Sequence, residues 1–180
     1  MHVTFITGNQ HKADYLMKWL GLPVEIKKLD LDELQSLDSK VVIEHKVRQA
    51  YAILGRPVLV EDVSLTFTAM GRLPGTLIKW FLEDMGLAGL CQLAQSLEHQ
   101  KAQAAITYAL FDGVEVRYFT ATQAGVIARE PRGDGGFGWN AVFIPEGSDE
   151  TYGEMDADTF KHWNIRAHAI EKLKNYLTNH

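Results

Sequence analysis

The sequence predicts an α/β domain built on a mixed sheet. Short runs rich in β-branched residues alternate with segments whose apolar residues recur at helical spacing. Two longer apolar runs are separated by Asp112-Gly113, a pair typical of a β-hairpin turn. No internal repeat, low-complexity tract or long linker divides the 180 residues. We therefore expect a single domain that spans residues 1–180.

The first half of the chain predicts alternating strands and helices. Its strand candidates are β-branched and apolar, and its helix candidates carry apolar stripes with a side-chain cap before them and glycine after them. The expected elements are a strand over 2–7, a helix from Asn9 to Gly21, a strand over 24–31, a helix from Asp38 or Ser39 to Gly55, and a short buried strand over 58–60.

The second half predicts one interrupted helix, the hairpin and a final helix. Glycine breaks the first helix, and the last one keeps an apolar face. The expected elements are a helix over 78–97 broken near Gly86 to Gly89, strands over 104–111 and 114–127, a short strand over 141–144, and a helix with Ala169, Ile170, Leu173, Tyr176 and Leu177 on one face.

Bulk properties exclude several functional classes. The net charge of −5 disfavours general binding to nucleic acid, because the protein as a whole repels a polyanion. No apolar run approaches the roughly 18 residues that span a bilayer, so we expect no membrane partner. The amino-terminal residues lack a secretory signal, and Cys91 is the one cysteine. We expect a cytoplasmic protein.

Thr7 to Lys12 lie between the first expected strand and its helix. Unpaired backbone amides at a helix start, together with the helix dipole, favour an anion there. Asn9 and Lys12 add side-chain donors, and Gly8 lets the chain turn. The alternative interpretation is a purely structural turn that is followed by a solvated lysine.

Glu61 and Asp62 follow a short buried strand. Ligands of α/β proteins usually bind at the carboxyl ends of strands, so we expect a metal ligand or a water-activating carboxylate here. Neighbouring strand residues point to opposite faces, so a regular strand would send only one of them into a given cleft. A solvated strand end is the alternative. Glu33 is a further candidate metal ligand, and its acidic neighbours leave the choice open: Asp30, Asp32 and Asp38.

Two later segments add candidate ligand contacts. A rigid glycine-proline turn precedes Lys79, which lies among bulky apolar residues and either reaches a phosphate or extends from a buried helix to solvent. In the segment 135–140, glycines permit close approach to a ligand and aromatic rings offer stacking surfaces for a base. Such loops also anchor chains in a core, which is the more frequent arrangement.

Five segments in order carry a family resemblance: TGNQHK, VEDVSL, GRLPGTLIKWF, GGFGWNAVFIPEG and an arginine that opens the last expected helix. Together they resemble the inosine triphosphate pyrophosphatase family over nearly the whole chain. VEDxSL followed by LPGxxIKWF is the most specific part, because chance seldom produces both in this order. The resemblance implies an elongated fold with a curved sheet flanked by helices and two lobes around an active-site cleft.

The resemblance also implies an activity and the residues that carry it. It implies metal-dependent hydrolysis of deaminated purine nucleoside triphosphates, such as those of inosine and xanthosine and their deoxy forms, to the monophosphate and pyrophosphate. A homodimer and Mg²⁺, with Mn²⁺ as an alternative ion, belong to the same expectation. Transferred position by position, the triphosphate contacts are Thr7, Gly8, Asn9, Lys12 and Lys79; the metal and catalytic carboxylates are Glu33 and Asp62, with Ser64 near them; and the base or sugar contacts are Phe137, Gly138, Trp139 and Arg166.

Two segments depart from the family's pattern. The family usually has aspartate where this chain has Asn140, and Ser-His-Arg where it has Asn164, Ile165 and Arg166. A carboxylate only accepts hydrogen bonds, an asparagine amide also donates, and isoleucine does neither. Because both changes lie in the base-reading region, we expect hydrolysis with a shifted or broadened base preference. Two alternatives stay open, the same reaction on another modified nucleotide and a nucleotide-binding or sensing protein with little turnover.

Overall fold

The computed structural model describes residues 2–180, which form two compact units. The first unit takes residues up to Val63, Ile106–Ala121 and Arg166–His180, and the second takes Ser64–Ala105 and Thr122–Ile165. One seven-stranded sheet has the order β2-β1-β3-β5-β6-β7, with β4 paired to β3. Both parallel and antiparallel pairs occur in it, so the predicted α/β class with a mixed sheet is confirmed.

Three strands contribute residues to both units: β3 (Val58–Phe67), β5 (Lys101–Phe111) and β6 (Val116–Ile127). The β5 and β6 strands are neighbours in the sheet and are joined at Asp112-Gly113, so the predicted hairpin is confirmed. Gly113 has φ 97°, which glycine adopts without strain.

The first unit also contains β1 (Thr4–Ile6), α1 (Gln10–Leu20), β2 (Glu25–Lys27), α2 (Ser39–Leu54) and nearly all of α5 (Ile165–Asn179). Its first two helices have the predicted ends. Asn9 caps α1 and Asp38 caps α2, each through its side-chain oxygen, while Gly21 and Gly55 end these helices in the left-handed conformation. The β2 strand is shorter than the expected 24–31.

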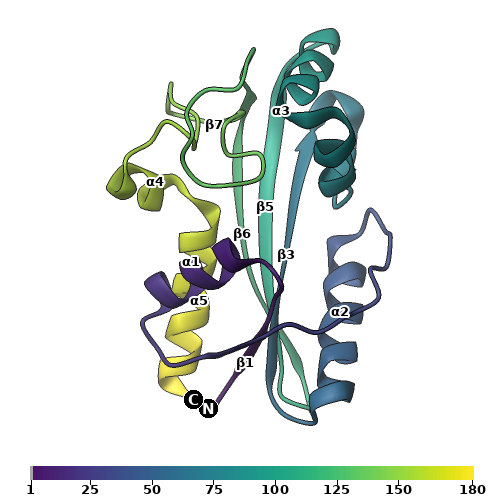
Figure 1. Ribbon diagram of the computed structural model, residues 1–180, viewed down its shortest axis with the longest axis vertical. Coiled ribbons are helices and arrows are strands. Elements are labelled where there is room, and N and C mark those ends of the chain that lie inside the picture. The colour runs from purple at the N-terminus through teal and green to yellow at the C-terminus, as the bar shows by residue number, and fades with distance from the viewer. Residues whose placement is uncertain (1) are drawn as a thin grey trace. The chain divides into compact units, whose positions relative to one another are not determined.

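In the first unit, helices cover both faces of the strands (Figure 1). The α2 side of the sheet carries a core of residues that alternate along the strands and meet the helix's apolar stripe: Ile6, Val58, Val60, Ala109 and Phe111 with Ile43, Val47 and Ala50. The intervening residues Phe5, Leu59 and Tyr108 are fully buried on the other side, where α1 and α5 lie. In the first unit, strand parity therefore assigns successive side chains of β3 to opposite helical layers.

The β3 strand corrects one expectation. We expected it to stop after residue 60, but it continues to Phe67 because Leu65 and Phe67 alternate with polar residues and are themselves buried. Glu61 and Asp62 therefore lie inside the strand. Its parallel partner β1 ends at Ile6, and the register places Phe5 beside Leu59. The two carboxylates thus stand just beyond the carboxyl end of β1.

The second unit adds a 3₁₀ turn (Thr68–Met70), β4 (Pro74–Gly75), α3 (Ile78–Ser96), β7 (Phe143–Pro145) and α4 (Ala157–Trp163). The predicted break in α3 is confirmed at Gly86, where φ is 66°. The 3₁₀ turn, β4 and α4 were not predicted. An aromatic core holds β7 and α4, with ring centroids 5.3 Å apart for Phe143 and Tyr152 and 5.7 Å apart for Tyr152 and Phe160.

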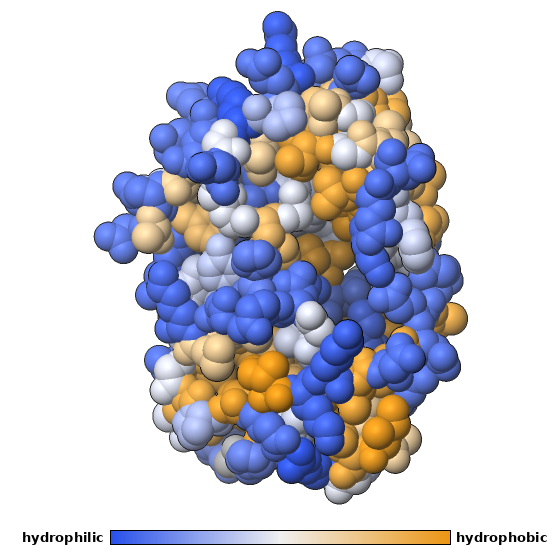
Figure 2. Space-filling view, viewed as in Figure 1, coloured by the Kyte–Doolittle hydropathy of each residue, from blue (hydrophilic) through white to orange (hydrophobic). Residues whose placement is uncertain are grey.

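The surface mixes polar and apolar residues. On the face in Figure 2, hydrophilic residues predominate, and apolar residues gather in places, including the region of α2. There Val41 and Ile53 are 47% and 53% exposed. Within residues 2–180, every helix falls short of the length or apolarity that crossing a membrane requires.

Candidate active site

The turn before α1 offers backbone and side-chain donors at an exposed position. Thr7 Oγ1 accepts a hydrogen bond of 3.1 Å from the Asn9 amide, and Asn9 Oδ1 accepts one of 3.2 Å from the Lys12 amide. Gly8 has no positive φ, and a Cβ there would lie 3.4 Å from the flexible side chain of Lys28, an ordinary contact. Neither strain nor crowding in the described chain explains this glycine.

Glu61 is the most heavily bonded carboxylate of the first unit. Its Oε2 accepts hydrogen bonds from the Tyr108 hydroxyl at 2.7 Å and from Arg166 Nε at 3.0 Å. Its Oε1 accepts a hydrogen bond from Arg166 Nη2 at 2.9 Å and lies 3.1 Å from Lys12 Nζ. Arg166 and Glu61 have side chains only 7% and 1% exposed, so this is a buried ion pair. The predicted contact residues Lys12 and Arg166 are therefore brought together on one carboxylate.

The charge state of this cluster follows from its neighbours. Burial opposes ionisation of Glu61, but the charges of Arg166 and Lys12 and the hydrogen bonds from Arg166 and Tyr108 outweigh burial, so the pKa of Glu61 is well below its usual value. Burial and the nearby Glu61 hold the pKa of Tyr108 well above its usual value. Glu61 is thus a fixed anion, and Tyr108 is a neutral donor.

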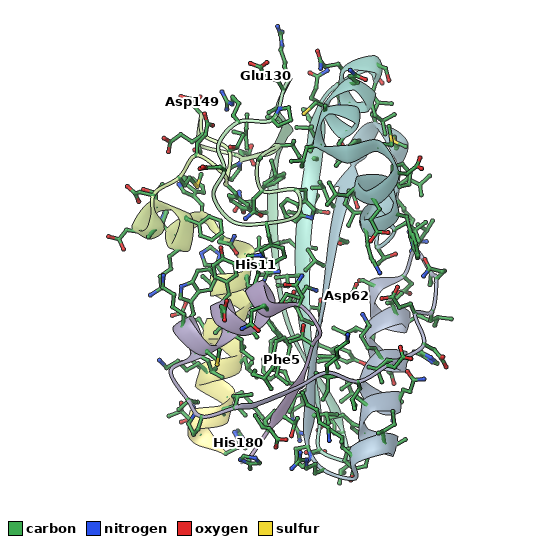
Figure 3. The ribbon with its side chains drawn as sticks, in the orientation of Figure 1. Phe5, His11, Asp62, Glu130, Asp149 and His180 are labelled. Carbon is green, nitrogen blue, oxygen red and sulfur yellow. The ribbon has the colours of Figure 1, made fainter. Side chains whose placement is uncertain are left out.

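Asp62 has a different environment from its neighbour. Its Oδ1 lies 3.4 Å from Lys46 Nζ on α2, whereas its Oδ2 is buried with no hydrogen-bond partner. In Figure 3, Asp62 lies on the α2 side of the strands, and His11 of α1 lies on the other side. Burial raises the pKa of Asp62, opposed by Lys46 and Lys12 and reinforced by Glu61. Asp62 is therefore the carboxylate better suited to accept a proton.

The acidic loop before α2 is tied to that helix at two places. The Asp32 amide donates to Gln49 Oε1 at 2.9 Å, and Gln49 Nε2 donates to Asp32 Oδ2 at 2.9 Å. Asp38 caps the helix. These two carboxylates therefore serve the fold. Glu33 is exposed to solvent.

Two predicted contact residues of the second unit lie on α3 and β3. Lys79 is an exposed second residue of α3, and its Nζ lies 5.1 Å from the ring centroid of Trp80. The helix start at Leu77 has no side-chain cap. Ser64, the first β3 residue of this unit, is half-buried.

The glycine-aromatic segment of the second unit is partly core. Trp139 is buried, and its ring centroid lies 5.5 Å from that of Phe143. Phe137 is half-buried, and Gly138 has φ 64°. Asn140 is buried, and its Nδ2 has no hydrogen-bond partner. A Cβ on Gly136 would lie 2.0 Å from that nitrogen, so this glycine makes room for the Asn140 amide.

Sequence reasoning missed three residues of the site. Lys46 interrupts the apolar stripe of α2, and Tyr108 carries a hydroxyl between Ile106 and Leu110 on the buried apolar face of β5. Those two signals were present in the sequence. Tyr15, one helical turn after Lys12, has its ring centroid 5.7 Å from the guanidinium carbon of Arg166. No sequence pattern links these two residues, which meet only after folding.

The arrangement has the parts that phosphate chemistry needs. A helix start with a nearby lysine attracts an anion, a fixed carboxylate holds two cations, and a second carboxylate with a raised pKa lies beside it. Within residues 2–180, no three His, Cys, Asp or Glu side chains approach closely enough to hold a metal ion by themselves. Mg²⁺ is usually held by one or two carboxylates together with substrate phosphates, so such a group is not required.

Comparisons with known proteins agree with this chemistry. A family model described as the Ham1 family matches residues 3–176. An inosine triphosphate pyrophosphatase of Yarrowia lipolytica is 41% identical, covering 98% of this chain and 96% of that protein. Inosine triphosphate pyrophosphatase 2 of Trypanosoma cruzi is also 41% identical, covering 96% of this chain and 90% of that protein.

Solved structures share the fold. A HAM1 protein from Coxiella burnetii has a TM-score of 0.84 at 21% identity and covers all of both chains. A protein of Mycobacterium abscessus described as a nucleoside-triphosphatase or dITP/XTP pyrophosphatase has a TM-score of 0.73 at 24% identity, covering 96% of this chain and 98% of that one.

Proposed function

The chain belongs to the Ham1 family, and on this premise we propose that it hydrolyses deaminated purine nucleoside triphosphates to the monophosphate and pyrophosphate. The substrates are the triphosphates of inosine and xanthosine and their deoxy forms. The observation that carries the proposal is the pair of neighbouring carboxylates with opposite environments, Glu61 bonded to Lys12 and Asp62 with an unpartnered buried oxygen. Relatives at 41% identity named inosine triphosphate pyrophosphatase support the substrate class.

The phosphate-binding residues of the proposal are Thr7, Gly8, Asn9, Lys12 and Lys79. The first four form an exposed turn at a helix start, where amides and the helix dipole favour negative charge. Lys12 adds a positive charge, and its side chain is 24% exposed. Phosphoryl transfer needs mainly positioning and charge neutralisation, and these groups supply both.

Asp62 is the proposed catalytic carboxylate. It orients the attacking water and accepts its proton, while the water oxygen bonds to phosphorus and the bridge between the α- and β-phosphates breaks. Lys46, 3.4 Å from Asp62 Oδ1, keeps the carboxylate in place. Glu61 has no proton-accepting part in this scheme, because its four donor contacts fill the acceptor sites of both oxygens. Asp62 has one such contact, from Lys46, so an acceptor site remains for the water proton when the ion is bound.

A divalent ion fits the donor set of the first unit. The buried Oδ2 of Asp62 has no partner, and a hard oxygen donor of this kind suits Mg²⁺, or Mn²⁺ in its place. We propose that Asp62 and Glu33 hold the ion together with substrate phosphates. When bound, the ion neutralises charge on the phosphates and on the departing pyrophosphate.

The base contacts of the proposal are Phe137, Gly138, Trp139, Asn140 and Arg166, with Ser64 beside the carboxylates. The buried Asn140 amide supports a second candidate, the same reaction on another modified nucleotide, because this amide donates a hydrogen bond that an aspartate cannot. We further propose a cytoplasmic homodimer. Light scattering at micromolar concentration tests the dimer, and a monomeric mass would contradict it.

Pyrophosphate release tests the function. Purified protein with Mg²⁺ is assayed against modified and ordinary nucleoside triphosphates, and pyrophosphate and orthophosphate are measured separately. We expect pyrophosphate from inosine or xanthosine triphosphate, and strong dependence on the divalent ion. Release of orthophosphate alone, or of neither product from the whole panel, would refute the proposal. Binding without turnover would instead favour a nucleotide sensor.

A further inference from the structure

Tyr108 lies in the middle of the sheet beside the proposed phosphate site. It is fully buried on β5, and its ring centroid is 6.1 Å from that of Phe5 on the same face. A buried tyrosine hydroxyl needs an acceptor, and Glu61 Oε2 provides one at 2.7 Å. Tyr108 therefore places one polar atom, its hydroxyl oxygen, on the buried apolar face of β5, where that oxygen contacts Glu61.

The Tyr108 hydroxyl completes the bonding of Glu61. A carboxylate has about four acceptor sites, and Glu61 has four donor contacts. Tyr108 and Arg166 Nε occupy Oε2, while Arg166 Nη2 and Lys12 approach Oε1. Each oxygen is thus shared between two donors. Lys12 thus contacts one oxygen, Oε1, of a carboxylate whose other oxygen is engaged by Tyr108 and Arg166.

Lys12 is the most exposed member of this cluster. Its side chain is 24% exposed, whereas those of Glu61 and Arg166 are 1% and 7% exposed. Two cations share one anion in the cluster, which leaves one positive charge for a bound anion to neutralise. How strongly Glu61 holds Lys12 therefore affects how strongly Lys12 holds a phosphate.

We propose that Tyr108 is a positioning residue for phosphate binding, acting through Glu61 on Lys12. The inference rests on the proposed function, in which Lys12 contacts the triphosphate. By occupying one acceptor site of Oε2, the hydroxyl keeps Glu61 turned so that Lys12 makes a single contact and its ammonium remains directed to the ligand. Tyr108 has no contact of its own with substrate in this scheme.

Tyr108→Phe removes the hydroxyl alone and keeps the ring in place. One buried acceptor site of Glu61 then lacks its donor, and the carboxylate shifts toward the nearest mobile donor, the Lys12 ammonium. Lys12 is held more tightly and binds phosphate less well. We expect KM for inosine triphosphate to rise about three- to tenfold, the size of effect that one ordinary hydrogen bond has, and kcat to change less than about twofold.

The same sheet offers a matched control. Tyr118 on β6 donates a hydrogen bond of 2.8 Å to Glu44 Oε2, and Glu44 is paired with Arg48 at 2.7 Å. Tyr118→Phe therefore removes a similar tyrosine-glutamate bond from the same unit, at a glutamate with no contact to Lys12. We expect unchanged KM and kcat for this variant, with a loss of thermal stability similar to or smaller than that of Tyr108→Phe.

The experiment is a double-mutant cycle of Tyr108→Phe and Lys12→Met, with Tyr118→Phe alongside. KM and kcat are measured for inosine triphosphate, and the dissociation constant of inorganic tripolyphosphate is measured by calorimetry. If Tyr108 acts through Lys12, Tyr108→Phe raises KM and the tripolyphosphate dissociation constant only in the protein that retains Lys12. Equal weakening in both backgrounds, or lower thermal stability with unchanged KM and unchanged tripolyphosphate affinity, would overturn the inference.

The two readouts separate this inference from the proposed function. If the unmodified protein releases no pyrophosphate from any triphosphate, the proposed function fails. The tripolyphosphate affinities then still decide the role of Tyr108, because they need no turnover. Weaker binding by Tyr108→Phe but not by Tyr118→Phe supports the inference in that case as well, and equal binding by all three proteins refutes it.

Discussion

Glu61 and Asp62 are adjacent on β3, yet they pair with lysines from opposite layers of the first unit. Glu61 Oε1 lies 3.1 Å from Lys12 of α1, and Asp62 Oδ1 lies 3.4 Å from Lys46 of α2. The pKa of Glu61 is lowered and that of Asp62 is raised. One carboxylate therefore remains an anion that holds cations, and the other is suited to proton transfer.

Asp62→Asn separates catalysis from folding. The amide keeps the shape of the side chain but accepts no proton, so we expect kcat for inosine triphosphate to fall about 10²- to 10⁴-fold. Because burial disfavours the ionised Asp62, the melting temperature should not fall. Asp112→Asn is the matched control for an aspartate outside the site, and its kcat should be unchanged. Near-normal turnover by Asp62→Asn would assign the chemistry to another group.

Glu61→Gln should mainly damage the fold. It leaves the buried guanidinium of Arg166 and the ammonium of Lys12 without their anion, which in buried ion pairs costs about 3–5 kcal/mol. Urea unfolding measures this loss. Glu44→Gln also removes one glutamate charge, but from a partly exposed pair with Arg48, so its cost should stay within about 1 kcal/mol. Equal losses of unfolding free energy for Glu61→Gln and Glu44→Gln would mean that burial of the Glu61 cluster does not contribute to stability.

Gly8→Ala tests whether a ligand approaches the turn before α1. Alanine fits the local backbone, so unfolding free energy should stay the same or rise by up to about 1 kcal/mol. If phosphate binds against this turn, the methyl group obstructs it and KM rises. Gly55→Ala should behave in the opposite way. It should lower the unfolding free energy, because φ is 64° at Gly55, and it should leave KM unchanged. An unchanged KM for Gly8→Ala would remove Gly8 from the binding site.

Asp112 makes the stability of the hairpin depend on pH. Hydrogen bonds from the amides of Glu115 and Val114, and then from Arg117, lower its pKa from 3.8 to about 2. Because the folded value is below the unfolded one, its contribution to stability is complete above about pH 4 and is lost as the pH falls toward 2.

Asp112→Asn keeps an acceptor for the two amides but does not titrate. We expect it to be less stable than the unmodified protein by a few tenths to about 1 kcal/mol at pH 6, and the difference should disappear near pH 2. Urea unfolding at several pH values measures this. A constant difference across that range would contradict the assigned pKa.

Asn140→Asp together with Ile165→His should restore the family's usual base selection. Aspartate replaces a donating amide with an acceptor, and histidine replaces an apolar side chain with a hydrogen-bonding one. A lost contact of this kind changes discrimination by about 1–3 kcal/mol, so relative kcat/KM values should shift by about fivefold or more. These ratios do not depend on the fraction of folded protein. Identical kcat/KM ratios for the unmodified and the doubly substituted protein would refute the role of Asn140 and Ile165 in base selection.

Local sequence signals predicted much of the first unit. Asn9 and Gly21 set the ends of α1, as Asp38 and Gly55 set those of α2, because caps act on neighbouring backbone groups. The short α4 was missed, although Asp156 caps it, because seven residues give little periodicity.

The extension of β3 and the bonding of Glu61 could be predicted less well. Burial of Leu65 and Phe67 extends β3, and it depends on what the second unit packs against them. The partners of Glu61 lie 47 residues away at Tyr108 and 105 residues away at Arg166. Such pairings are set by sheet register and helix docking, for which a single sequence has no local signal.

The distance along the chain between Glu61 and Arg166 also determines when their ion pair can form during synthesis. A buried carboxylate is synthesised 105 residues before the guanidinium that neutralises it. Lys12 and Tyr108 are available earlier, but the ion pair with Arg166 waits for residues 166–180, which also complete the first unit. Until then Glu61 lacks its guanidinium partner, so the final packing of the first unit is expected after translation has passed α5.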